Sequence, residues 1–168
     1  MIKIKDTISK MREYLDYIEE HYDNVQKAWK IIQEKCSDMK FIYDDFSFYI
    51  LNNDIKNHDE SKLDKEEFQY YRQYFFPTEK EEFIANSCNG MSVKDYYKDN
   101  FNIAWEMHKA HNQHHWQTWT RINYHYPEQS TINCVHMVID WMAMSMKFGD
   151  TAKDYYEKNI ILKCQLSE

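Results

Sequence analysis

The stretch that decides the fold is residues 7–36, TISKMREYLDYIEEHYDNVQKAWKIIQEKC. Its apolar residues recur every three or four positions, at Ile8, Met11, Leu15, Ile18, Tyr22, Val25, Trp29 and Ile32. That spacing places them on one face of an α-helix. The pattern predicts one long amphipathic helix from about Thr7 to Cys36, with His21 at the edge of its apolar face.

The same periodicity continues along the rest of the chain. It predicts helices at about 43–57, from 61 or 64 to Pro77, from 93 or 100 to about 120, from 130 or 131 to Gly149, and at about 151–162. Residues 78–94 are less regular, with a turn at Asn89-Gly90. We therefore expect an all-α protein, in which residues 1–168 form a single-domain bundle of about six helices.

The scarcity of glycine excludes several kinds of site. The chain of 168 residues has only 2 glycines, Gly90 and Gly149, and they lie far apart. A P-loop, a G-x-G-x-x-G dinucleotide fingerprint and a G-x-S-x-G nucleophile elbow all need glycines close together. A chain like this that handles phosphate must therefore do so with side chains and a metal.

The net charge and the cysteine content limit which partners the protein can bind and in which cell compartment we expect it. The net charge of −7 argues against nonspecific nucleic-acid binding and against docking on an anionic membrane. There is no 18-residue apolar run and no signal-peptide core. The four cysteines are widely spaced without a C-x-x-C pair, which indicates reduced thiols and a cytoplasmic protein. The oligomeric state is left open.

Two acidic positions are candidate metal ligands. His58-Asp59 offers an imidazole and a carboxylate, which together suit Fe, Mn, Co or Zn, and both side chains can reach one ion at a helix end. The alternative is a solvated loop. Asp140 lies in the apolar run 138–142, where an ionised carboxylate is costly unless it is paired or bound to metal. His136 at i−4 is an alternative partner for Asp140, and a place at the solvent edge is another.

A third candidate set is a run of histidines in the helix that ends near residue 120. His108, His111 and His115 are spaced to share one helical face, and His114 is rotated away from them. A single histidine here would be read as a polar group near the core, but so many in eight residues favour metal or phosphate binding for some of them. We treat His136 as structural.

Taken in order, His21, His58-Asp59, the middle histidines and Asp140 resemble the H…HD…(H…H)…D pattern of the HD-domain superfamily. Lys62 is similar to the lysine that follows the doublet in some phosphodiesterase members, with Ser61 in place of their glycine. The motifs H-D-x-S-K, A-W-x-x-H, N-x-H-H and D-W also resemble an uncharacterised family of small HD-like proteins from bacteria and phages. The resemblance covers about residues 18–150.

This resemblance implies an HD-like helical fold that holds one or two divalent ions. It makes first-metal ligands of His21, His58, Asp59 and Asp140, with Asp59 as the bridge to any second ion. His108 with His114 or His115 would hold that second ion or contact a substrate phosphate. Asp59 and Lys62 would take the catalytic roles, and Lys62 would stabilise charge on the phosphate.

The implied function is metal-dependent hydrolysis of a small phosphate ester, a nucleotide or cyclic nucleotide, by a metal-activated water. Three alternatives remain open. The first is an HD-like di-iron oxygenase. The second is a three-His metal bundle enzyme that uses His111, His115 and His21. The third is a non-catalytic helical protein that binds a nucleotide or a partner.

Overall fold

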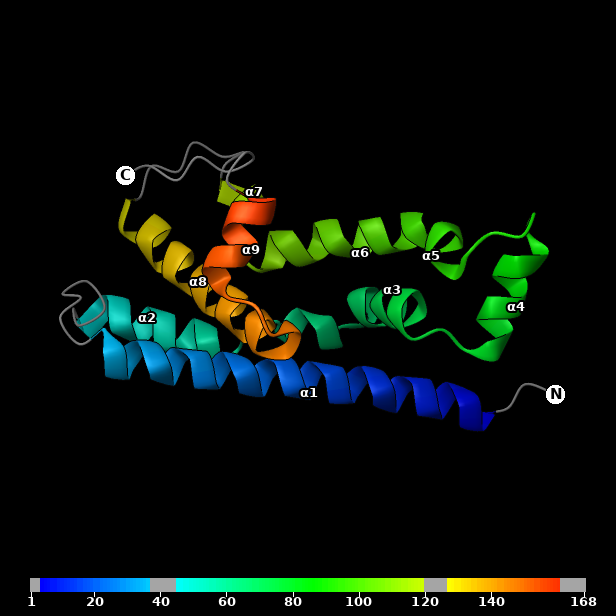
Figure 1. The fold of residues 1–168 in the computed structure, drawn as a ribbon, viewed down its shortest axis with the longest axis horizontal. Helices are drawn as coiled ribbons and strands as arrows, with labels where there is room; N and C mark the ends of the chain where they lie inside the picture. The colour runs from blue at the N-terminus through cyan, green and yellow to red at the C-terminus, as the bar shows by residue number, and fades with distance from the viewer. Residues whose placement is uncertain (1–3, 37–44, 120–126, 161–168) are drawn as a thin grey trace. The chain divides into compact units, whose positions relative to one another are not determined.

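The structure, a computed structural model, describes residues 4–36, 45–119 and 127–160. These residues form helices and turns and contain no strand, which confirms the all-α prediction (Figure 1). Within the same ranges, no helix has both the length and the apolar character that a membrane crossing requires. The chain packs as two compact units. The first unit combines Met1–Glu20 with Asp59–His111, and the second unit combines His21–His58 with Asn112–Glu168.

The long first helix, α1 (Ile4–Lys35), confirms the helix predicted from residues 7–36. Its beginning belongs to the first unit and the rest to the second, and it runs without a break (Figure 1). In the second unit its apolar face is buried, with Val25 and Trp29 at 0% and 4% exposure. In the first unit the same face is half-exposed at Ile8, Met11 and Leu15.

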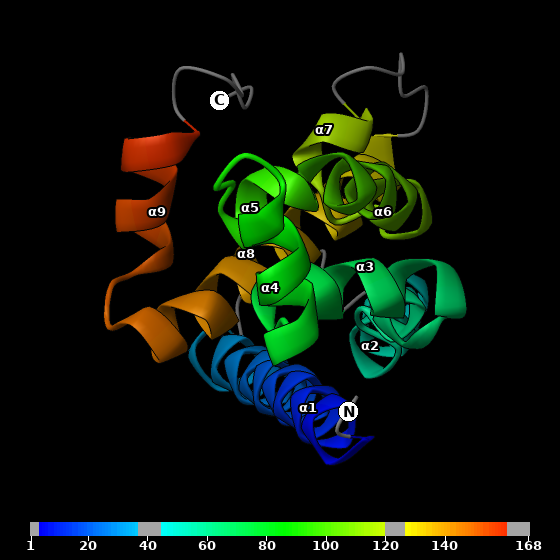
Figure 2. The ribbon, with the colours of Figure 1, turned by 90° about the vertical axis from the view of Figure 1, so that its right-hand side faces the viewer.

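The first unit packs around α3 (Lys65–Phe75) and α6 (Lys98–His111), which lie against each other. Its core joins Tyr14 of α1 to Tyr71 of α3 and Ala104 of α6. The shorter elements are η2 (Glu60–Leu63), a 3₁₀ helix before α3, and the neighbouring helices α4 (Glu79–Ser87) and α5 (Val93–Tyr96) (Figure 2).

The helix α4 falls in the segment that looked irregular in the sequence. It begins at a capping box, in which the Thr78 hydroxyl accepts a hydrogen bond from the Glu81 amide at 3.3 Å. In return, the Glu81 carboxylate accepts one from the Thr78 amide at 2.8 Å. The T-x-x-E spacing of such a box was the sequence signal for this helix.

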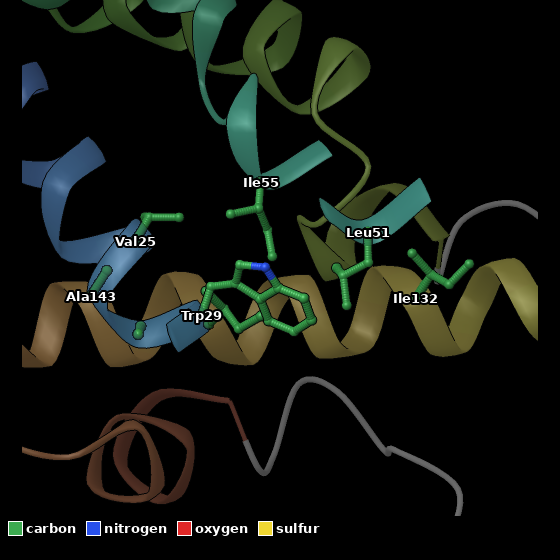
Figure 3. Packing of buried hydrophobic residues seen from close by; sticks show 8 residues of the cluster. Val25, Trp29, Leu51, Ile55, Ile132 and Ala143 are labelled. Atoms are coloured by element: carbon green, nitrogen blue, oxygen red, sulfur yellow. The ribbon is translucent and has the colours of Figure 1, made fainter. Parts of the chain in front are cut away.

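The second unit contains α2 (Asp45–Lys56), α7 (Trp116–Trp119), α8 (Pro127–Phe148) and α9 (Ala152–Asn159). Its core draws on α1, α2 and α8, and Figure 3 shows Ile55 pointing toward the Trp29 indole. The Gln26 side chain donates a hydrogen bond to the Ile55 carbonyl at 2.9 Å. This contact ties the end of α2 to α1 just before His58.

Two helix boundaries differ from the prediction. The helix expected to reach about residue 120 ends at His111, and a turn follows in which the His115 amide bonds to the Asn112 carbonyl at 3.2 Å. Asparagine favours turns because its side chain competes for backbone hydrogen bonds. The short helices α5 and α7 were also not expected as separate elements.

The second difference is at α8. It begins at Pro127, so the expected cap at residue 130 or 131 is wrong, and proline is well tolerated in the first helical turn. The predicted end at Gly149 is confirmed, since Gly149 has a left-handed φ of 78°.

Glu81 also makes an ion pair in the first unit that we expect to be acid-sensitive. Its carboxylate binds the Arg72 guanidinium at 2.5 and 2.7 Å. Burial opposes ionisation, but the bonds from Arg72, Thr78 and Gln73 lower the pKa of Glu81 from 4.5 to about 2. The stabilisation is therefore present above pH 4.5 and is lost as the pH falls toward 2.

We predict that Glu81→Gln lowers the free energy of unfolding by about 2 kcal/mol at pH 7, because hydrogen bonds to charged groups are lost. The difference from the wild type should shrink as the pH falls below about 4.5. Urea unfolding at several pH values measures it, with the exposed Glu82→Gln as the control. A pH-independent difference would contradict the account.

Candidate metal centre

The second unit gathers histidines and one carboxylate from separate helices. His21 comes from α1, His58 follows α2, and His136 and Asp140 lie one turn apart on α8. His114 comes from the turn before α7. The four histidines are 2% to 6% exposed, and the Asp140 side chain is 13% exposed. These residues form a buried polar cluster in the second unit.

Three donor atoms of this cluster lie at the spacing of metal ligands. His21 Nε2 is 3.0 Å from His58 Nε2 and 3.1 Å from Asp140 Oδ1. His58 Nε2 is 3.6 Å from the same carboxylate oxygen. Two ligands that are each about 2.1 Å from one ion lie about 3.0 Å apart at a right angle and about 3.4 Å apart in a tetrahedron. His21, His58 and Asp140 can therefore hold one divalent ion, and we call them the carboxylate triad.

The position of Asp140 removes one of the three readings that the sequence left open. Its carboxylate contacts two buried imidazoles, and its side chain is largely removed from water. The solvent-edge alternative is therefore wrong. Burying an ionised carboxylate among apolar residues costs free energy unless hydrogen bonds, opposite charge or a metal offset it.

The second ring nitrogen of His58 faces another group of imidazoles. His58 Nδ1 lies 2.9 Å from His136 Nε2. The ring centre of His114 is 4.6 Å from that of His58 and 4.5 Å from that of His136. We call His58, His114 and His136 the imidazole trio. The sequence reasoning treated His136 as structural, although its place at i−4 from Asp140 was the signal that it shares a face with the site.

Asp59 and its neighbours form a charged cluster in the first unit. Asp59 has a left-handed backbone with φ 58°, and its carboxylate binds the Lys62 ammonium at 2.5 Å. His108 Nε2 lies 3.3 Å from Asp59 Oδ1, and His108 Nδ1 lies 2.9 Å from Glu67 Oε2. His111 reaches the other Glu67 oxygen at 3.3 Å. Glu67 is 0% exposed, so its carboxylate contacts other residues of the cluster and not solvent.

The opposite charges of this cluster stabilise each other. Burial alone would lower the pKa of His108, but the Asp59 and Glu67 carboxylates raise it above its ordinary value of 6.5. Burial would likewise raise the pKa of Glu67, but hydrogen bonds with His108, His111 and Ser61 lower it. Sequence reasoning missed Glu67, which lies four residues before the buried Tyr71 and on the same face of α3.

The predicted site residues thus fall into the two units. The second unit contains His21, His58, Asp140, His114 and His115, and the structure brings the first three together. The first unit contains Asp59, Lys62 and His108, which contact one another directly. His115 does not continue the helical face of His108 and His111, because α6 ends at His111.

Comparison with known protein families assigns the chain to one of them. Residues 10–165 match a family of unknown function, DUF5662, and the chain belongs to that family. No curated protein and no solved structure matches the chain.

We predict that Glu67→Gln lowers the pKa of His108, because one of its two carboxylate neighbours loses its charge. Protonated His108 stabilises the folded chain below pH 6.5, and this contribution is lost as the pH rises through the raised pKa. A histidine NMR titration of the metal-free protein measures the change. The exposed neighbour Glu66→Gln should leave the titration as in the wild type, and an unchanged pKa in Glu67→Gln would contradict the assignment.

Proposed function

We propose that this protein is a metal-dependent hydrolase that cleaves a small phosphate ester, a nucleotide or cyclic nucleotide. The observation that carries the proposal is the carboxylate triad, whose three donor atoms lie 3.0 to 3.6 Å apart. Three protein ligands leave positions on the ion for water and substrate, which is typical of catalytic rather than structural metal sites.

The donor set indicates which ions suit the site. Two imidazole nitrogens and one carboxylate oxygen suit Fe, Mn, Co or Zn. Such an ion, when bound, lowers the pKa of a coordinated water and polarises a phosphoryl oxygen. His58 is oriented by its contact with His136, which favours the tautomer with a proton on Nδ1 and a lone pair on Nε2.

Lys62 and the order of the site residues in the chain support phosphate as the substrate. The chain carries a net charge of −7 and only 2 glycines, so an anionic substrate needs positive charge from an ion and from side chains. Lys62 supplies one such charge beside Asp59, at the position where the resembled phosphodiesterases have their lysine. The order of His21, His58-Asp59 and Asp140 in the chain is the pattern that the resemblance to HD-domain hydrolases rests on.

The same triad favours one other function. Two histidines and one carboxylate on a single ion are also the donor set of iron oxygenases that activate dioxygen. Turnover that stops when oxygen is removed would support this second candidate. Hydrolysis that continues anaerobically supports the first.

We expect His21→Gln and Asp140→Asn to weaken Mn²⁺ binding by more than the roughly 10- to 100-fold that loss of an outer hydrogen-bond partner costs. Hydrolysis in a metal-supplemented screen of nucleotides and generic phosphate esters should be lost with it. Calorimetric titration and phosphate release measure the two effects. The matched control is His111→Gln, whose side chain is 57% exposed and lies in the first unit. Wild-type Mn²⁺ affinity in both triad variants would remove the proposed centre.

Lys62 allows the phosphate part of the proposal to be tested separately from the metal part. We predict that Lys62→Met lowers turnover roughly 100-fold, as removal of one charge-stabilising donor does in other enzymes. The Mn²⁺ affinity should stay as in the wild type. The exposed Lys65→Met provides the control. Full turnover in Lys62→Met would show that this lysine does not contact the substrate.

A further inference from the structure

The imidazole trio has the composition and spacing of a metal site in its own right. His58 Nδ1 and His136 Nε2 are 2.9 Å apart, close to the spacing of about 3.0 Å that two ligands of one ion have at a right angle. The three residues can each offer a nitrogen within 4.8 Å of the others. All three are at least nine-tenths buried.

The ring arrangement agrees with this reading. An imidazole centre lies about 3.2 Å from an ion bound at 2.1 Å, so rings at right angles around the ion have centres about 4.6 Å apart. The three centre-to-centre distances of the trio are 4.5, 4.6 and 5.1 Å.

We propose that the second unit has a second metal position, held by His58 Nδ1, His114 and His136, that competes with the carboxylate triad for His58. A neutral imidazole has one lone pair and one N–H, so it binds one ion through one nitrogen. An ion at the triad uses His58 Nε2, and an ion at the trio uses His58 Nδ1. The triad and the trio therefore hold one ion between them at a time.

The two positions differ in the metal that each prefers. The triad includes the Asp140 carboxylate, and carboxylate oxygen suits Mn²⁺. The trio offers imidazole alone, which suits Zn²⁺ and Cu²⁺. His58 is therefore a ligand that the two positions share. Zn²⁺ bound at the trio removes one of the three donors of the triad. The regulatory part of this inference rests on the proposed function, whereas the existence of the second position does not.

The experiment measures Zn²⁺ and Mn²⁺ affinities of the purified chain and of single variants, by chelator competition and Mn²⁺ EPR. We expect His114→Gln and His136→Gln to weaken Zn²⁺ binding at least about 10-fold and to leave Mn²⁺ binding within a few-fold. Glutamine at 136 keeps an acceptor for the His58 N–H. Asp140→Asn should weaken Mn²⁺ binding and leave Zn²⁺ binding within a few-fold. His58→Gln should weaken the binding of both ions.

Cu²⁺ EPR gives a second readout, since nitrogen couplings count the bound imidazoles. The wild type and Asp140→Asn should show three nitrogens, and His114→Gln should show two. His111→Gln is the control, and circular dichroism without metal checks folding. If His136→Gln does not fold, His114→Gln carries the test alone, since His114 lies in a turn outside the helices.

Two results would overturn the inference. One is wild-type Zn²⁺ affinity in the trio variants. The other is an equal loss of Zn²⁺ and Mn²⁺ affinity in them, which would make His114 and His136 outer supports of the triad. A failure of the proposed hydrolase is distinguishable, because it would leave the Zn²⁺ and Cu²⁺ results unchanged while no phosphate ester is cleaved.

Discussion

The two ring nitrogens of His58 face different donors, and the rest of the site depends on that constraint. Nε2 lies beside His21 and Asp140, and Nδ1 lies beside His136. A neutral imidazole can offer a lone pair on only one side, so the contact on one side determines the chemistry on the other. An ion at the triad requires the proton on Nδ1, where His136 can accept it. The tautomer of one buried residue thus links the two groups.

The apolar core of the second unit holds these polar donors in place. His21 precedes Val25 by one helical turn, His58 follows Ile55, and Asp140 follows Ile139 directly. All three apolar residues are fully buried in one cluster. The packing of a neighbouring apolar residue therefore fixes the position of each donor. This arrangement lets a small protein bury a carboxylate and several imidazoles, since core packing offsets part of the cost of desolvating them.

Much of this could be predicted from local sequence, and the rest depended on distant contacts. The spacing of Ile8 to Ile32 predicted α1, and Gly149 marked the end of α8. The cost of burying Asp140 drew attention to it as a candidate ligand. The roles of His136 and Glu67 were missed, because each depends on a partner from another helix. The end of α6 at His111 was missed too, because Asn112 alone is a weaker stop signal than glycine or proline. A single sequence also gave no means to see that Asp59 contacts Lys62 and His108 while His58 contacts His21.

The most direct test of the account is the anomalous scattering of crystals of the protein grown with Mn²⁺. The account predicts one strong peak about 2.1 to 2.2 Å from His21 Nε2, His58 Nε2 and Asp140 Oδ1. A peak bound only by other residues would contradict it. So would the absence of a peak at saturating Mn²⁺ with the imidazoles of His21 and His58 still in direct contact.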